Sequence, residues 1–168
     1  TSVGPILDRM LFVLGLYVTP DGQAAVCITP IITLWNPYNV ALDTDGLVAY
    51  PYIDLPSFYS IFKNGVNAFG SVMSQTAGLQ LGQPGAGRET EPYFYCEMTA
   101  NGTGQLNTPL HFAPGEVKVF QPASSTPVVF RRPNSIKGSA RVIRMMPATT
   151  SISKARGGIA YPANQTMP

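Results

Sequence analysis

The stretch from residue 24 to residue 40 restricts the fold of this chain more than any other part of the sequence. Its first part, Ala24–Trp35, reads AAVCITPIITLW, which is largely apolar or β-branched and ends at the only tryptophan. Such a run is typical of a strand, and it is too short to cross a membrane. We expect a buried strand that is broken or bulged at Pro30, because proline cannot donate to a sheet ladder. Trp35 is expected to close the core, and Asn36-Pro37-Tyr38-Asn39 to turn the chain.

Glycine and proline indicate the class of the fold. The chain has 16 of each among 168 residues, in turn-like clusters spread along the sequence, and 10% of its residues are aromatic. This spacing favours an all-β protein over a helical one. We predict an antiparallel β-sandwich, Ig-like or jelly-roll-like, over residues 1–146, with long Gly/Pro-rich loops. Residues 147–168 have few apolar anchors and are predicted to form an extended or disordered C-terminal arm.

Further strands are expected wherever β-branched and aromatic residues lie between turn signals. These segments are 9–18, 47–53, 57–63, 79–81, 93–99, 110–121, 128–132 and 141–146. The turn sequence Thr19-Pro20-Asp21-Gly22 is expected to join the first of them to the central strand as a hairpin. Within 110–121, Pro114-Gly115 is predicted to make a corner from which Val117 and Phe120 return to the core.

The charge of the chain is low and unevenly distributed. Only 12% of the residues are charged, whereas about a quarter is typical of soluble domains, which suggests that neighbouring molecules cover part of the surface. Residues 1–117 hold all nine acidic residues and three basic ones, and residues 118–168 hold the other eight basic residues. A basic segment of this kind can bind nucleic acid, an anionic membrane or an acidic protein face, or it can pair with the acidic part of its own fold.

We predict that the basic segment forms contacts between subunits. Nucleic-acid binding is not expected, because the basic residues are scattered and are not interleaved with aromatic ones. The basic residues predicted to form the contact are Arg131, Arg132, Arg141, Arg144, Lys154 and Arg156, and their acidic partners are Asp43, Asp45, Glu89 and Glu91. Such a contact weakens as salt rises, because salt screens exposed charges.

No residue pattern points to a catalytic, metal or cofactor site. His111 is the only histidine, and Cys27 and Cys96 lack the CxxC spacing of a zinc site. The two cysteines are predicted to form either a disulfide or two separate buried thiols. Asp43-Thr44-Asp45-Gly46 resembles part of a calcium loop but lacks the terminal glutamate of an EF-hand, so a turn is expected. We predict a protein that is not an enzyme, has no cofactor and has no transmembrane segment, since the apolar run 10–18 is too short.

Two segments carry a likeness to a known family. These are ITPIITLWNPYNVAL, residues 28–42, and FAPGEVKVFQP, residues 112–122. Together with the strands between them they resemble the Verru_Chthon cassette protein A family over about 100 residues. Its members are large surface-system proteins of Verrucomicrobia and their relatives, encoded beside pilin-like partners. The resemblance implies export and a role in an envelope-associated, pilus-like or secretion assembly, and it brings no catalytic residues. Family members are much longer, which implies that this chain corresponds to a fragment or a reduced relative.

The first functional hypothesis is therefore a structural or assembly subunit of an extracellular or envelope-associated appendage, at the cell surface or in the periplasm. Its partners would be copies of itself or other subunits, joined by β-strand addition and by charge complementarity. The alternative is a carbohydrate-binding β-sandwich module that uses Trp35, Tyr38 and neighbouring tyrosines. A second alternative is a viral capsid-like jelly roll, which shares the β-rich composition and the basic tail.

Overall fold

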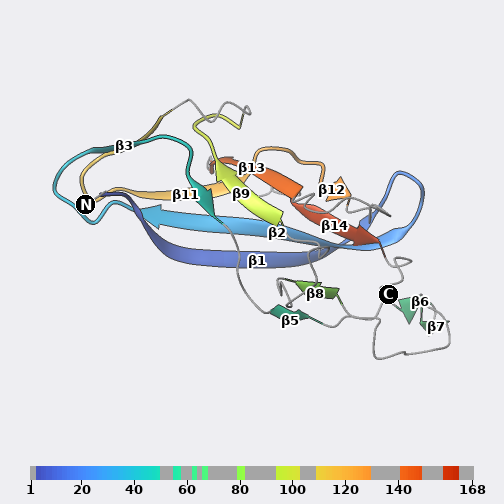
Figure 1. Cartoon of the computed structure of the whole chain (residues 1–168). Helices are drawn as coiled ribbons and strands as arrows, with labels where there is room; N and C mark the ends of the chain where they lie inside the picture. Colours follow the sequence, from blue (N-terminus) through green and yellow to red (C-terminus); the bar gives the residue numbers. More distant parts are fainter. Residues whose placement is uncertain are drawn as a thin grey trace, which may run out of the picture.

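The chain folds into strands in the part that the structure describes. The computed structural model (Figure 1) describes residues 3–49, 55–57, 62–63, 66–67, 79–81, 94–102, 109–129, 141–148 and 157–162, and no helix is found among them. The prediction of an all-β fold is therefore confirmed.

Eight strands form one mixed sheet in the order β12-β14-β2-β11-β13-β9-β4, with β1 paired to β2 outside this path. They are β1 (Ile6–Val18), β2 (Ala24–Trp35), β4 (Val48–Ala49), β9 (Phe94–Met98), β11 (Val117–Pro122), β12 (Val128–Val129), β13 (Arg141–Pro147) and β14 (Ile159–Pro162). The prediction of a purely antiparallel sheet is wrong, because β9 pairs with β13 in parallel and β12 pairs with β14 in parallel. Parallel neighbours need long connections, and the described part of the chain between β9 and β13 contains three strands.

The central strand β2 organises this sheet, as its apolar sequence predicted. β1 pairs with it along its whole length, from Ala24 to Trp35. A strand has only two edges, so β14, opposite residues 25–28, and β11, opposite residues 32–35, share the other edge end to end. The sheet therefore forks at residues 29–31 of β2.

The strand β2 runs through Pro30 without the predicted break or bulge. Phe12 lies opposite Pro30, and the pairing with β1 stays in register on both sides of it. Pro30 lies in the fork, where no described strand pairs with the edge of β2 that β11 and β14 share, so its missing N–H removes no ladder bond on that edge. The bulge lies in β1 instead, where the register shifts between Leu7 and Arg9 and leaves Asp8 as the extra residue.

The hydrophobic core lies on the face of β2 that carries its even-numbered residues. Val26, Ile28, Ile32 and Leu34 of this face pack with buried side chains of β9, β11, β13 and β14. Phe12 of β1 packs edge to face on Phe94 of β9, with ring centroids 6.3 Å apart. Three strands separate β1 from β9 in the sheet, so the sheet curls over its own core.

The remaining described strands form two-stranded ribbons. They are β3 (Leu42–Thr44) with β10 (Leu110–Phe112), β5 (Leu55–Ser57) with β8 (Leu79–Leu81), and β6 (Phe62–Lys63) with β7 (Val66–Asn67). The predicted strands 47–53, 57–63 and 128–132 lie only partly within the described residues. The hairpin turn before β2 is confirmed, with Gly22 at a φ of 80° and its N–H bonded to the Thr19 carbonyl at 2.8 Å.

Two residues that were predicted to lie in the core are exposed. Trp35 is 40% exposed and Val117 55%. They lie opposite each other on the face of the sheet that points away from the core. Phe120, three residues further along β11, is fully buried as predicted.

Part of the segment predicted as an arm, 147–168, adds β14 to the sheet of its own chain. Ile159 and Ala160 are fully buried there against β2. Gly158 has a φ of 133°, and a Cβ atom at this position would lie 2.1 Å from the Ile28 carbonyl oxygen. Only glycine therefore allows the chain to approach β2 so closely. Residues 149–156 and 163–168 lie outside the described part of the chain.

Candidate interaction surface

The strand β1 is the longest of the described strands and forms an edge of the sheet. All of its 13 residues except the bulged Asp8 pair with β2 on one side, and no strand among the described residues pairs with its other side. Figure 1 shows β1 beside β2 at the margin of the sheet. An edge of this kind presents backbone N–H and C=O groups that can pair with an extended segment of another chain.

The side chains of β1 do not protect this edge. Protected edges carry lysines, prolines or inward-pointing charges along the strand. The only charges of β1 are Asp8 and Arg9, at the bulge near its start, and the following MLFVLGLYV has none. In this uncharged part Leu14 is 62% exposed, Leu16 81% and Val18 68%.

A second apolar surface, here called the outer patch, crosses three strands on the face away from the core. Residues opposite each other in adjacent strands point to the same face, so the registers place these side chains together. The patch consists of Ile6, Leu11 and Val13 of β1, Trp35 of β2, and Val117 and Val119 of β11, each between 37% and 55% exposed. Ile6, Trp35 and Val117 form one row across the strands.

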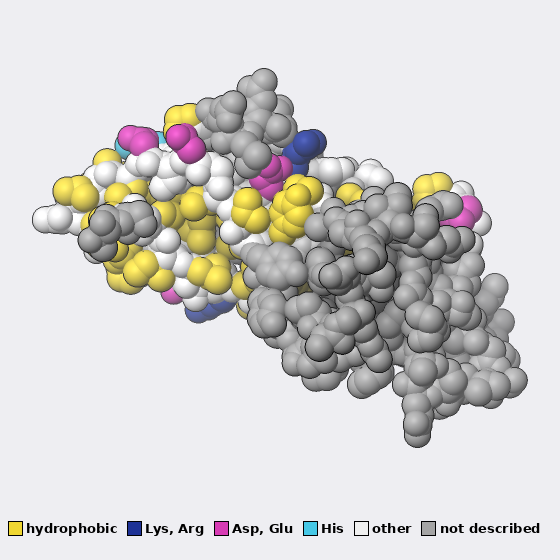
Figure 2. Space-filling view, in the orientation of Figure 1, with side chains coloured by type: hydrophobic (Ala, Val, Ile, Leu, Met, Phe, Trp, Pro, Cys, Tyr) yellow, Lys and Arg dark blue, Asp and Glu magenta, His cyan; other side chains and the backbone are white. Residues whose placement is uncertain are grey.

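Hydrophobic side chains are also seen in space-filling view. On the face shown in Figure 2 they gather toward the end of the sheet where the N-terminus lies, with acidic side chains and the histidine along one border. Contiguous exposed apolar surface with a polar border is typical of protein-contact sites.

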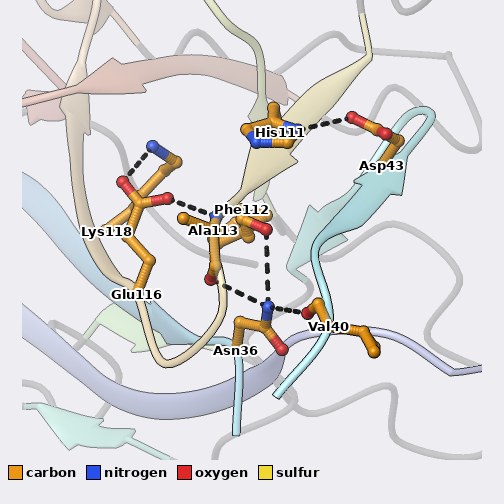
Figure 3. A network of polar contacts seen from close by, with 8 residues as sticks. All are labelled: Asn36, Val40, Asp43, His111, Phe112, Ala113, Glu116 and Lys118. Atoms are coloured by element: carbon orange, nitrogen blue, oxygen red, sulfur yellow. Dashed lines mark hydrogen bonds and ion pairs between the residues drawn. The ribbon is translucent and has the colours of Figure 1, made fainter. Parts of the chain in front are cut away.

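A buried asparagine fixes the corner beside the outer patch. Asn36 follows β2 directly and is fully buried. Its Nδ2 donates to the carbonyl oxygens of Val40 at 2.8 Å and Ala113 at 2.9 Å, with a longer contact of 3.4 Å to that of Phe112. Its Oδ1 accepts the Tyr38 N–H at 3.1 Å. Figure 3 shows the side chain pointing between the two chain segments that it joins.

The second of these segments is a tight turn, residues 113–116, with charged side chains around it (Figure 3). Glu116 accepts the Ala113 N–H at 2.7 Å, and Lys118 donates to its other carboxylate oxygen at 2.5 Å. These hydrogen bonds lower the pKa of Glu116, the one from Lys118 more than the one from Ala113. Lys118 also lies 5.6 Å above the Phe112 ring. These contacts hold the start of β11, and with it Val117, in place beside Trp35.

The two segments on which the expected family likeness is based lie against each other. Residues 28–42 contain the second part of β2, from residue 28 to residue 35, and the turn of Asn36, and residues 112–122 contain the tight turn and β11. They are joined by the β2–β11 ladder, by the side chain of Asn36 and by the Gly115 N–H, which donates to the Tyr38 carbonyl at 3.1 Å. Sequence reasoning missed the role of Asn36, although an asparagine directly after an apolar strand and before proline is a local signal for it.

The charged residues predicted to join subunits are only partly described. Arg144 is exposed, and its Nε lies 3.6 Å from Glu97 on the neighbouring strand β9. Asp43 is exposed and bonded to His111 Nδ1 at 2.9 Å, and Asp45 is exposed in the bend after β3. Only the backbone of Arg141 is described, in β13. The residues outside the described part are Arg131, Arg132, Lys154, Arg156, Glu89 and Glu91.

Neither cysteine is in a disulfide, so of the two predicted states the structure has the separate buried thiols. Cys96 belongs to the core, whereas Cys27 lies between the core residues Val26 and Ile28 and therefore points to the opposite face of β2. Burial raises the pKa of Cys96 to about 12. Burial also raises the pKa of Cys27, and a hydrogen bond with Thr29 partly offsets this. Both thiols are therefore protonated and unreactive near neutral pH.

Among the described residues there is no group of three or more His, Cys, Asp or Glu side chains that could hold a metal ion. Nor does the described part contain a helix with the length and apolarity needed to span a membrane. Comparisons with protein-family models, with curated proteins and with solved structures found no match for this chain.

Proposed function

We propose that the chain is a non-enzymatic structural subunit of an extracellular or envelope-associated assembly, pilus-like or secretory, whose subunits join along the edge of β1. One observation carries the proposal: a 13-residue strand without a described partner on its outer side exposes a run of large apolar side chains. Backbone pairing along such an edge supplies affinity, and the side chains on its two faces supply specificity.

Three further features support this function. The outer patch adds apolar surface directly beside the edge, and the low overall charge fits a surface that neighbours cover. The resemblance to a family of surface-system proteins agrees with export to the envelope. We interpret the curled sheet as a β-sandwich in which β1 and β2 form one layer and β9 part of the other.

The charge layout supports a second contact of the same assembly. Arg144, with the other basic residues of its segment, would meet Asp43, Asp45 and the other acids of a neighbouring subunit. Because Asp43, Asp45 and Arg144 are exposed, this contact is expected to weaken as salt rises.

Electron microscopy of envelope material isolated from the native source tests the proposal. The chain, located with a labelled antibody, is expected in continuous filaments or regular surface assemblies, and their subunits are expected to separate in part at high salt. A chain that is dispersed and outside any assembly at both salt concentrations would refute the structural role.

A carbohydrate-binding module is the second candidate, because Trp35 and Tyr38 are both exposed and lie close in the sequence, at the end of β2 and in the following turn. Exposed aromatic rings can stack on the apolar faces of sugars. Trp35 is the only tryptophan, so its fluorescence reports directly on binding. A saturable change with an oligosaccharide, lost in Tyr38→Ala, would favour this candidate. Unchanged fluorescence across a glycan panel would exclude it.

A further inference from the structure

A partner for the outer edge of β1, which no described strand pairs with, is indicated by the lengths of the strands. Besides β1, the strands that end the large sheet are β4 and β12, with two residues each. Neither can cover an edge of 13 residues. The described strand that matches β1 in length and is unpaired on one side is β1 itself, in a second copy of this chain.

We propose that two copies of this chain pair antiparallel through β1 and form one continuous sheet about a two-fold axis. This inference rests on the proposed function and names the partner of its edge. A two-fold contact brings the same surface of both copies together, so its residues must be complementary to themselves. β1 meets this condition, because its uncharged part has no like charges to oppose each other.

The alternation of side chains restricts the register of this pairing. After the bulge, Met10, Phe12, Leu14, Leu16 and Val18 share the face of the core residues, and the residues between them share the outer face. In a continuous sheet, opposite residues must point to the same face, so one residue must lie opposite its own copy, with the two-fold axis midway between these two copies. For an axis near the middle of the uncharged part, the residue that pairs with its own copy is therefore residue 12, 13 or 14.

The register in which Val13 lies opposite its own copy fits the side chains of β1 best. It pairs residues 9–17 and leaves the bulge at Asp8 outside the new ladder. Leu11 then lies opposite Gly15, where a Cβ atom would have nothing within 4 Å, so there is space for the leucine side chain. Arg9 lies opposite Tyr17, an arrangement in which the guanidinium can stack on the ring. The outer patches of the two copies also meet at Leu11 and Val13.

Sedimentation of the purified full chain tests whether the pair forms. We expect a concentration-dependent monomer–dimer equilibrium at micromolar concentrations. Leu11→Lys/Val13→Lys places charges at the centre of the pairing and is expected to raise the dissociation constant at least about 100-fold. Val40→Lys, at an exposed residue in the turn after β2, is the matched control and is expected to leave it unchanged. Circular dichroism and urea unfolding of each variant show whether it is folded.

Single cysteines test the register without depending on a disruptive variant. Val13→Cys is expected to form a disulfide-linked dimer under mild oxidation, whereas Val40→Cys is not. Leu11→Cys mixed with Gly15→Cys is expected to give more cross-linked dimer than either protein alone. A wild-type chain that stays monomeric at all concentrations, or a dimer that none of the cysteines in β1 cross-links, would overturn the β1 pairing. Native filaments seen together with an isolated monomer would leave the proposed function standing and remove only this inference.

Discussion

Replacement of Asn36 by alanine is expected to lower the free energy of unfolding by a large amount for the loss of one polar side chain. The substitution removes two short hydrogen bonds from Nδ2, to Val40 and Ala113, and one to Oδ1, from Tyr38. Each bond contributes roughly 1 kcal/mol, and buried groups that lose their partner add a desolvation cost. Because Asn36 is fully buried, water does not replace the side chain readily. We expect the free energy of unfolding to fall by about 3 kcal/mol, a large part of the 5–15 kcal/mol that is usual for a domain.

Urea unfolding followed by circular dichroism measures this loss. Asn39→Ala is the matched control, since Asn39 lies in the same turn with an exposed side chain, and a change within about 0.5 kcal/mol is expected. Asn36→Asp keeps the shape and the acceptor but replaces the donor by a carboxylate that faces carbonyl oxygens. It should therefore be at least as destabilising at neutral pH and recover partly in acid, where the protonated group can donate. A loss below about 1 kcal/mol in Asn36→Ala would refute the view that this side chain holds the two segments together.

Three further predictions concern stability. Gly158→Ala puts a Cβ atom 2.1 Å from the Ile28 carbonyl oxygen and should cost more than about 2 kcal/mol in urea unfolding. Gly4→Ala, where a Cβ atom has nothing within 4 Å, should cost nothing, and equal effects of the two substitutions would contradict the close approach of β14 to β2. The pKa of Cys96 is raised from its ordinary 9.0 to about 12, so between these pH values the unfolded chain releases a proton that the folded chain keeps. The free energy of unfolding should fall there by up to about 1.4 kcal/mol per pH unit, and by less in Cys96→Ala; identical slopes would show that Cys96 is not buried. The pKa of Glu116 is lowered by its hydrogen bonds with Lys118 and Ala113, so its stabilising effect is present above its unfolded pKa and lost as pH falls through the folded one. Glu116→Gln should therefore lower stability near neutral pH and flatten its dependence on pH in acid, and an unchanged acid profile would count against this contact.

Local sequence patterns predicted where individual strands and turns lie, but not which strands pair with each other in the sheet. The first hairpin, the weak strand β8 and the strand β9 were found from local patterns of apolar and turn residues. The parallel pairing of β9 with β13 could not be found in this way, because it depends on which distant strands meet. Pro30 misled the prediction for the same reason, since proline is tolerated in β2 only because the two strands on that edge leave a gap there.

The candidate surface shows the same limit. Trp35 was expected in the core because it ends an apolar strand, but the alternation of β2 places it on the face opposite to Leu34. The exposure of Trp35 depends on which segments cover each face of the sheet, and a local sequence pattern does not contain this information. Asn36 could have been singled out from its position before proline, whereas its partners Phe112 and Ala113 are more than 70 residues away in the chain.

The difference between β1 and β2 locates the surface that a partner should cover. Both strands are apolar at nearly every position, without the polar alternation of a strand that has one face in water. β2 has the environment that this pattern predicts, because strands lie on both of its edges and most of its side chains are buried. β1 has the same pattern, yet most of its side chains are exposed. Where local pattern and environment disagree, a functional site is expected. A second β1 strand would pair the backbone along the uncharged part of this edge and cover the flanks of its side chains. It would also bring the outer patches of both copies side by side, as the surface through which pairs can join into a larger assembly.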